Sequence, residues 1–186
     1  MKKNKKLLII AYAFPPHSVV GSMRPLRMVK YLKKVSGWRP LVLTVDKEFR
    51  RNDYSLLDEI PQEVGVYRSW IMEPAFWFAK LRSALFPDTF GNRDRSTDRD
   101  AVRVNTLKSF FRQTLGRMLS LMTEALSFPD SQVFWNLPVI LKSLKIIREN
   151  RISAVLITSP PWSLQIAGYA LKKITGVPFV VDFRDP

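Results

Sequence analysis

Residues able to do chemistry gather where three apolar runs of the sequence end. His17 and Gly21 follow the first run, Ser159 follows a later one, and Asp182-Phe183-Arg184-Asp185 follows the last. If these runs are parallel strands, their carboxyl ends border the crevice in which such sheets bind ligands. His17 could orient a substrate hydroxyl or phosphate, and Asp185 could hydrogen-bond a substrate. These two are the candidate catalytic residues.

The loop after the first run also carries binding candidates. A glycine followed by a helix N-terminus can receive an anionic group through backbone N–H groups and the helix dipole. Only one glycine is present, so this is not a G-x-G-x-x-G dinucleotide fingerprint, and the chain contains no P-loop motif. The predicted substrate-binding residues are Gly21, Ser22, Arg24, Ser159, Asp182 and Arg184.

Each candidate has a structural alternative. His17 is also compatible with a solvent-facing loop, and Asp182 and Arg184 with a simple ion pair or a helix cap. Ser22 can cap a helix whose buried face is Leu26, Met28, Val29, Leu32 and Val35. Ser159 can likewise cap a helix with Pro160 in its first turn, and this reading is favoured over an acceptor-pocket role.

The elements that position these residues form a β-α-β pattern. Continuous apolar runs predict buried parallel strands at 7–12, 41–45, 154–158 and 177–182, and a weaker pattern predicts another strand at 64–71. Apolar residues at helical spacing predict helices between them, including one with Leu137, Ile140, Leu141, Leu144 and Ile147 on its buried face. Gly37 and Gly176 are predicted to end two of these helices. The fold class is therefore α/β, a Rossmann-like parallel sheet with helices on both faces, which these residues leave incomplete at the C-terminal side.

Composition restricts the partners. The 186 residues contain 30 Lys and Arg against 16 Asp and Glu, a net charge of +14, which favours polyanions such as acidic lipid or phosphorylated ligands. Nucleic acid is not expected, because the aromatic residues lie in apolar periodic runs. There is no cysteine and one histidine, so disulfides, thiolate metal sites and multi-histidine metal clusters are excluded, and we expect no metal or other cofactor.

The chain is predicted to be a single domain, 1–186, with a mobile polar insertion at about 87–105. The basic N-terminus and the apolar run after it resemble a signal peptide, but a buried first strand is favoured and no run is long enough to span a bilayer. A basic helix face and an aromatic segment could instead rest on an anionic membrane, or be a solvated face and a core helix. The predicted membrane-facing residues are Arg27, Lys30, Lys34, Phe76, Trp77 and Phe78.

Four segments in order carry a resemblance to a known family. They are PPHSVVGSMRPLRMVKYLKKVSGWRPLVLTV, FPDSQVFWNLP, TSPPW and GVPFVVDFRDP. Together they resemble the N-terminal, acceptor-side domain of family-4-like glycosyltransferases. Relatives often have two or three glycines in the first loop, where this chain has Val19, Val20 and Gly21.

The resemblance implies one half of a GT-B enzyme. Such enzymes transfer a sugar from a nucleotide-sugar, with retention of configuration and generally without a catalytic metal, to acceptors that include glycolipid and polysaccharide intermediates. Gly21 would lie near the donor phosphates, and Asp182, Arg184 and Asp185 would face the cleft. The donor-binding domain would follow DFRDP and is not among these residues, so we expect the chain alone to be inactive.

The implied partners are a donor domain or its separate chain, a lipid-linked acceptor and an anionic membrane surface. A homodimer through an exposed sheet or helices is a further expectation, because the predicted sheet would leave apolar surface uncovered. The expected location is the cytoplasm, at the inner face of the plasma membrane if the contact with lipid holds. The alternative function is a catalytically inactive remnant that binds a membrane or another partner.

Overall fold

The computed structural model describes residues 5–47, 51–71 and 128–184. All of these except Phe128 belong to one compact unit, formed by residues 1–72 and 129–186. Several predictions lie outside the described residues: the aromatic segment with Phe76, Trp77 and Phe78, the insertion at 87–105, and Asp185.

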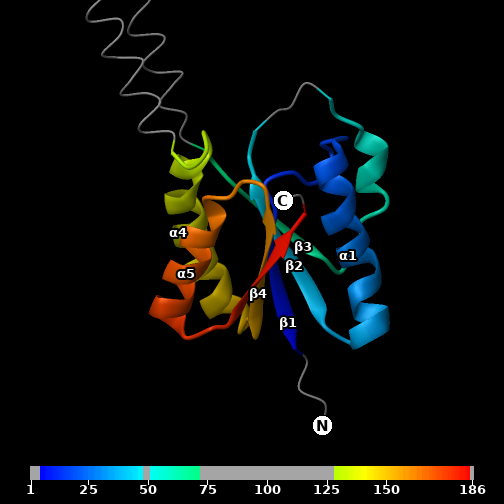
Figure 1. The fold of residues 1–186 in the computed structure, drawn as a ribbon. Helices are drawn as coiled ribbons and strands as arrows, with labels where there is room; N and C mark the ends of the chain where they lie inside the picture. The colour runs from blue at the N-terminus through cyan, green and yellow to red at the C-terminus, as the bar shows by residue number, and fades with distance from the viewer. Residues whose placement is uncertain (1–4, 48–50, 72–127, 185–186) are drawn as a thin grey trace, which may run out of the picture. The chain divides into compact units, whose positions relative to one another are not determined.

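The described residues form one five-stranded parallel sheet in the order β3-β2-β1-β4-β5 (Figure 1). Its strands are β1 (Lys6–Ile10), β2 (Arg39–Val45), β3 (Gly65–Ser69), β4 (Ala154–Ser159) and β5 (Phe179–Phe183). The helices are α1 (Val20–Ser36), α4 (Asn136–Asn150) and α5 (Leu164–Thr175), with 3-10 turns at Tyr54–Leu57 and Val133–Trp135. The prediction of a Rossmann-like α/β sheet is confirmed, with each strand within a few residues of its expected place.

The sheet is buried on both faces because its strands are apolar at consecutive positions. In β1, Leu8 and Ile10 join the core beneath α4 and α5, whereas Ile9 joins the core beneath α1. All three are fully buried. Successive side chains of a strand point to opposite faces, so an unbroken apolar run requires cover on both sides. Figure 1 shows α1 on one side of the sheet, and α4 and α5 on the other.

Helix α1 begins earlier than its predicted cap. Ser22 lies within the first turn, and its hydroxyl donates to the carbonyl oxygens of His17 and Val19, so the prediction of Ser22 as the cap is wrong. Leu26 and Val29 are buried as expected, but Val35 is 85% exposed because the helix extends past the sheet-facing core in its last turn. Gly37 ends the helix in the left-handed conformation, at φ 72°, as predicted.

The predicted buried face of α4 is confirmed in part: Ile147 is buried, and Ile140 and Leu144 pack against the core. Leu137 and Leu141 are 56% and 59% exposed, while Val139, Ser143 and Ile146 are buried. The helix has apolar residues around more than half of its circumference, so periodicity alone does not select the contact face. The buried stripe includes Ser143, which the apolar pattern of the sequence does not mark.

Helix α5 begins at Leu164, not after Ser159, which is the last residue of β4. The prediction of Ser159 as a cap with Pro160 in the first turn is therefore wrong. Asp130 satisfies the helix start instead: its carboxylate accepts hydrogen bonds from the Ser163 N–H at 2.7 Å and the Ser163 hydroxyl at 2.8 Å. Gly168 permits close packing, since a Cβ there would lie 2.7 Å from the Phe179 ring.

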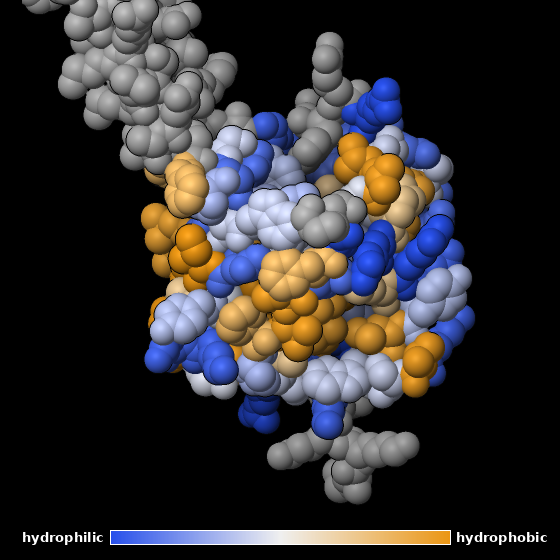
Figure 2. All heavy atoms as spheres, in the orientation of Figure 1, coloured by the Kyte–Doolittle hydropathy of each residue, from blue (hydrophilic) through white to orange (hydrophobic). Residues whose placement is uncertain are grey.

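The edge strand β5 is incompletely covered. Val180 and Phe183 are 58% and 59% exposed. Figure 2 shows apolar side chains gathered over and beside β5, between α1 and α5. This exposure agrees with the expectation that the sheet leaves apolar surface uncovered. Among the described residues, no helix is both long and apolar enough to cross a membrane.

The Asp130 contact generates a stability prediction. Replacing Asp130 with Ala leaves the Ser163 N–H at the start of α5 without its acceptor, which should lower the free energy of unfolding by about 1–2 kcal/mol. Urea titration followed by circular dichroism measures the change. Glu149→Ala is the matched control, because it removes one acidic charge from an exposed side chain whose ion pair with Lys145 is 3.8 Å long. Equal effects of the two substitutions would contradict the capping role.

Candidate functional site

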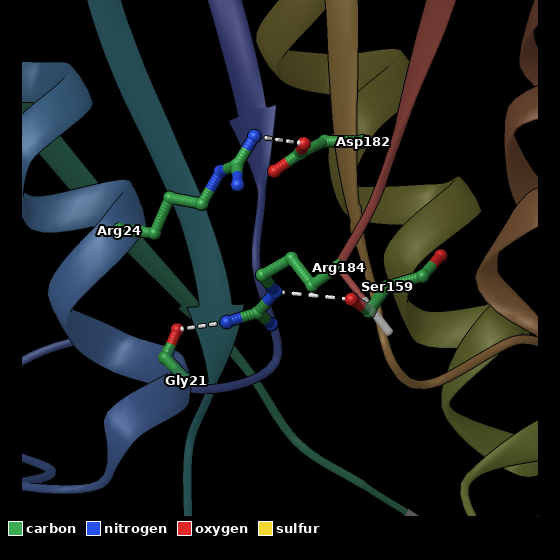
Figure 3. A network of polar contacts seen from close by, with 5 residues as sticks. All are labelled: Gly21, Arg24, Ser159, Asp182 and Arg184. Atoms are coloured by element: carbon green, nitrogen blue, oxygen red, sulfur yellow. Dashed lines mark hydrogen bonds and ion pairs between the residues drawn. The ribbon is translucent and has the colours of Figure 1, made fainter. Parts of the chain in front are cut away.

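Arg184 joins the ends of three elements at the carboxyl edge of the sheet. Its Nε donates to the Ser159 carbonyl oxygen at 3.0 Å, and its Nη1 donates to the Gly21 carbonyl oxygen at 2.6 Å (Figure 3). Ser159 ends β4, Gly21 lies in the first turn of α1, and Arg184 directly follows β5. The predicted convergence of these three loops is therefore confirmed for Gly21, Ser159 and Arg184. We call the group formed by Gly21, Arg24, Ser159, Asp182 and Arg184 the Arg184 cluster.

The proline inside α1 explains why the Gly21 carbonyl is available. In a regular helix this oxygen would accept from the N–H of residue 25, but residue 25 is proline and has no N–H. The Arg184 guanidinium takes the place of that donor. The absence of a side chain at Gly21 leaves room for this contact, since a Cβ there would lie 3.2 Å from Arg184 Nη1 and the guanidinium would have to shift by a few tenths of an ångström. Gly21 thus supports the guanidinium, whereas its predicted contact with donor phosphates stays a prediction.

A second contact in the Arg184 cluster crosses between α1 and β5. Arg24 Nη2 lies 2.6 Å from Asp182 Oδ1, with the Arg24 side chain 54% exposed and the Asp182 side chain 10% exposed. Asp182 pairs in register with Thr158 of β4, so both side chains lie on the α1 face. Within the described part of the chain, Asp182 Oδ2 and the Thr158 hydroxyl have no hydrogen-bond partner. Both atoms are buried, so each is a polar group removed from water without a compensating hydrogen bond.

The other face of this edge is aromatic. Trp162 follows β4 and Phe183 ends β5, and their rings stack with centroids 5.8 Å apart and planes 25° apart. Phe183 is 59% exposed and Trp162 is 36% exposed. The edge therefore combines a polar group on the α1 side with a partly exposed aromatic pair on the other side.

His17 does not belong to the Arg184 cluster. It is 2% exposed, and its Nε2 lies 2.9 Å from the Lys47 carbonyl oxygen. A carbonyl only accepts, so Nε2 carries the proton in the neutral ring. Burial lowers the pKa of His17 despite the opposing hydrogen bond to Lys47, and the positive charge of Arg68 lowers it further. The expectation of a solvent-facing histidine is wrong, and the ring holds the loop after β1 against the segment after β2.

The predicted basic face of α1 is partly neutralised. Lys30 Nζ lies 2.8 Å from Glu59 Oε2, and the adjacent Lys33 pairs with Glu63. The ion pair raises the pKa of Lys30. Arg27 and Lys34 are exposed. For metal binding, the described ranges contain no cluster of three or more histidine, cysteine or acidic side chains.

Sequence reasoning missed three residues that organise the site. Pro25 frees the Gly21 carbonyl, Thr158 supplies a buried hydroxyl, and Asp130 holds the start of α5. Only Pro25 carried a signal in the sequence, since a proline four residues after a glycine in a helix always leaves a carbonyl without its usual donor. The positions of Thr158 and Asp130 depend on strand register and on contacts across 33 residues of chain.

Because Pro25 and Arg184 affect the same carbonyl, substitutions at the two residues should have non-additive effects on the free energy of unfolding. Arg184→Met should lower the free energy of unfolding by about 1–3 kcal/mol, because two partly buried carbonyl groups lose a charged donor. Pro25→Ala supplies an N–H to Gly21, so Arg184→Met should cost at least ~0.5 kcal/mol less in that background. Urea unfolding of the four proteins measures the coupling. Additive costs within error would show that the two donors do not share this carbonyl.

The lowered pKa of His17 predicts a pH dependence. Its ordinary value is 6.5, and the folded-state pKa is lower. Above pH 6.5 the ring is neutral in both states; below it the unfolded chain binds the proton first, so stability falls with pH until the folded-state pKa is passed. His17→Gln keeps an N–H donor without titrating, and its loss of stability between pH 7.5 and pH 5.5 should be smaller. Equal losses in urea titrations would rule out His17 as the source.

Comparisons with known proteins do not identify a family for this chain. No model of a known protein family matches the sequence, and no curated protein matches it. The fold and the contacts of the Arg184 cluster are therefore the basis for inferring function.

Proposed function

We propose that this chain is the acceptor-side domain of a retaining, family-4-like glycosyltransferase. The proposed reaction transfers a sugar from a nucleotide-sugar to a glycolipid or polysaccharide intermediate. One observation carries the proposal: segments of the resemblance that are far apart in sequence make specific contacts. Arg184 of the DFRDP segment donates hydrogen bonds to the carbonyl oxygens of Gly21 and Ser159, which lie in the first segment and in TSPPW. Asp130 of FPDSQVFWNLP accepts a hydrogen bond from Ser163, which follows TSPPW.

The chemistry of the Arg184 cluster suits an acceptor. Glycosyl transfer needs an acceptor hydroxyl aligned with the anomeric carbon and a leaving diphosphate stabilised by positive charge or N–H donors. We propose that the acceptor hydroxyl enters the edge beside Asp182 Oδ2 and the Thr158 hydroxyl, two buried polar atoms that have no partner among the described residues. The diphosphate requires a second, donor-binding domain, which we propose is supplied by another segment or a separate chain.

A lipid-linked acceptor would place the domain at an anionic membrane surface. The exposed Arg27 and Lys34 on α1 support this, since each basic residue near such a surface contributes ~1 kcal/mol. The ion pairs of Lys30 and Lys33 reduce the available charge. We therefore propose that recognition of the acceptor contributes to membrane contact together with charge.

Acceptor binding is testable with the full chain. Flotation with vesicles of zwitterionic lipid should retain the chain only when the vesicles carry a polyprenyl-diphosphate-linked sugar. Thr158→Val removes a hydroxyl without changing charge and should weaken retention about 5-fold or more, because the ligand hydroxyl loses a hydrogen-bond partner in a buried site. Circular dichroism checks that the variant folds. Asp182→Asn should weaken retention similarly, whereas Asp58→Asn, the matched charge change at an exposed position, should not.

Incubation of the chain with nucleotide-sugars is the second test of the proposal. The chain alone should neither hydrolyse UDP-glucose or GDP-mannose nor transfer their sugar. Retention on vesicles that lack the glycan, or turnover of a nucleotide-sugar by the chain alone, would overturn the assignment to the acceptor side.

A further inference from the structure

A pocket at the carboxyl edge of the sheet is separate from the Arg184 cluster. This pocket has a volume of about 420 Å³ and lies where β1, β2 and β3 end. None of the residues of the Arg184 cluster lines it. Its size is sufficient for a small organic ligand. The polar residues that line it are His17, Asp46, Lys47, Asn52, Tyr54 and Arg68.

The charge of this pocket comes mainly from Arg68. This side chain is half-buried on β3, and its Nη2 donates to the Pro15 carbonyl oxygen at 2.9 Å, which fixes the guanidinium without neutralising it. Among residues 5–47, 51–71 and 128–184, no carboxylate lies within ion-pair distance of Arg68. Burial is the main cause of the lowered pKa of His17, and the positive charge of Arg68 adds to it. A fixed guanidinium with unused N–H donors is suited to a carboxylate or a phosphate.

The other groups in the pocket are better suited to bind ligand hydroxyls than a second anionic group of the ligand. Asp46 offers a carboxylate acceptor, Asn52 offers an amide, and Tyr54 offers a phenol on a ring that is 66% exposed. No hydrogen bond joins these three side chains to the rest of the described protein. An aromatic ring provides a flat apolar surface, and its hydroxyl provides a polar handle at the same place. This combination of one cation, hydroxyl partners and a flat ring is more selective than a simple basic patch.

We propose that this pocket binds an anionic sugar, with Arg68 holding its carboxylate or phosphate and Asp46, Asn52 and Tyr54 contacting its hydroxyls and ring. The carboxylate of a sugar acid and the phosphate of a sugar phosphate share the chemistry that Arg68 recognises. Binding here does not require that the chain take part in glycosyl transfer.

Calorimetric titration of the full chain with glucuronic acid, glucose 1-phosphate and neutral glucose tests the proposal. At least one anionic sugar should bind 10-fold or more tightly than glucose, and the comparison of the two anions identifies the preferred group. Arg68→Gln should weaken that binding at least 10-fold. The matched control is Arg27→Gln, which removes one positive charge from the exposed face of α1 and should change the affinity less than 2-fold. Circular dichroism confirms that each variant is folded.

Tyr54→Ala is the second variant, because Tyr54 is largely exposed and its loss leaves the core intact. It should weaken binding about 5-fold even if Arg68→Gln proves unstable. Absence of binding by both anionic sugars, equal affinity for glucose, or an equal loss in Arg27→Gln would overturn the proposal. The last of these outcomes would assign the binding to the net charge of +14 alone.

Discussion

The parallel alignment of five strands is the constraint on which the structure depends. Parallel pairing brings all five carboxyl ends to one edge, so loops that are more than a hundred residues apart in sequence meet there. The pairing is maintained by burial on both faces: Leu8 and Ile10 face one core while Ile9 faces the other. Both the Arg184 cluster and the pocket around Arg68 are consequences of that alignment.

The two sites at this edge use arginine in different ways. Arg184 donates to two main-chain carbonyl oxygens, one of which is available because Pro25 cannot supply the usual helical N–H. Arg68 is fixed by a single carbonyl and keeps further donors directed at a pocket. The first arginine therefore stabilises the arrangement of loops, and the second has donors left for a ligand. The sequence alone does not distinguish the structural role of Arg184 from the ligand-binding role proposed for Arg68.

Sequence reasoning succeeded where a single local rule decides the outcome. Continuous apolar runs predicted four of the strands and a weaker pattern predicted β3, and Gly37 and Gly176 were correctly placed at helix ends, where both adopt positive φ. It failed where several local rules apply at once. Ser22 and Ser159 both satisfied the pattern of a cap, yet one lies inside α1 and the other ends β4. A capping pattern is common in loops, so it does not by itself mark a helix start.

The sequence by itself determined the fold class, the strand positions and the three loops that carry Gly21, Ser159 and Arg184, because these follow from hydrophobicity and backbone preference along a short stretch. Only the tertiary structure decided the contacts of the side chains. It placed His17 in the Arg68 pocket and away from Arg184, paired Arg24 with Asp182, and chose the face of α4 that packs on the sheet. These contacts depend on strand register and on distances between segments far apart in the chain, which a local pattern does not contain.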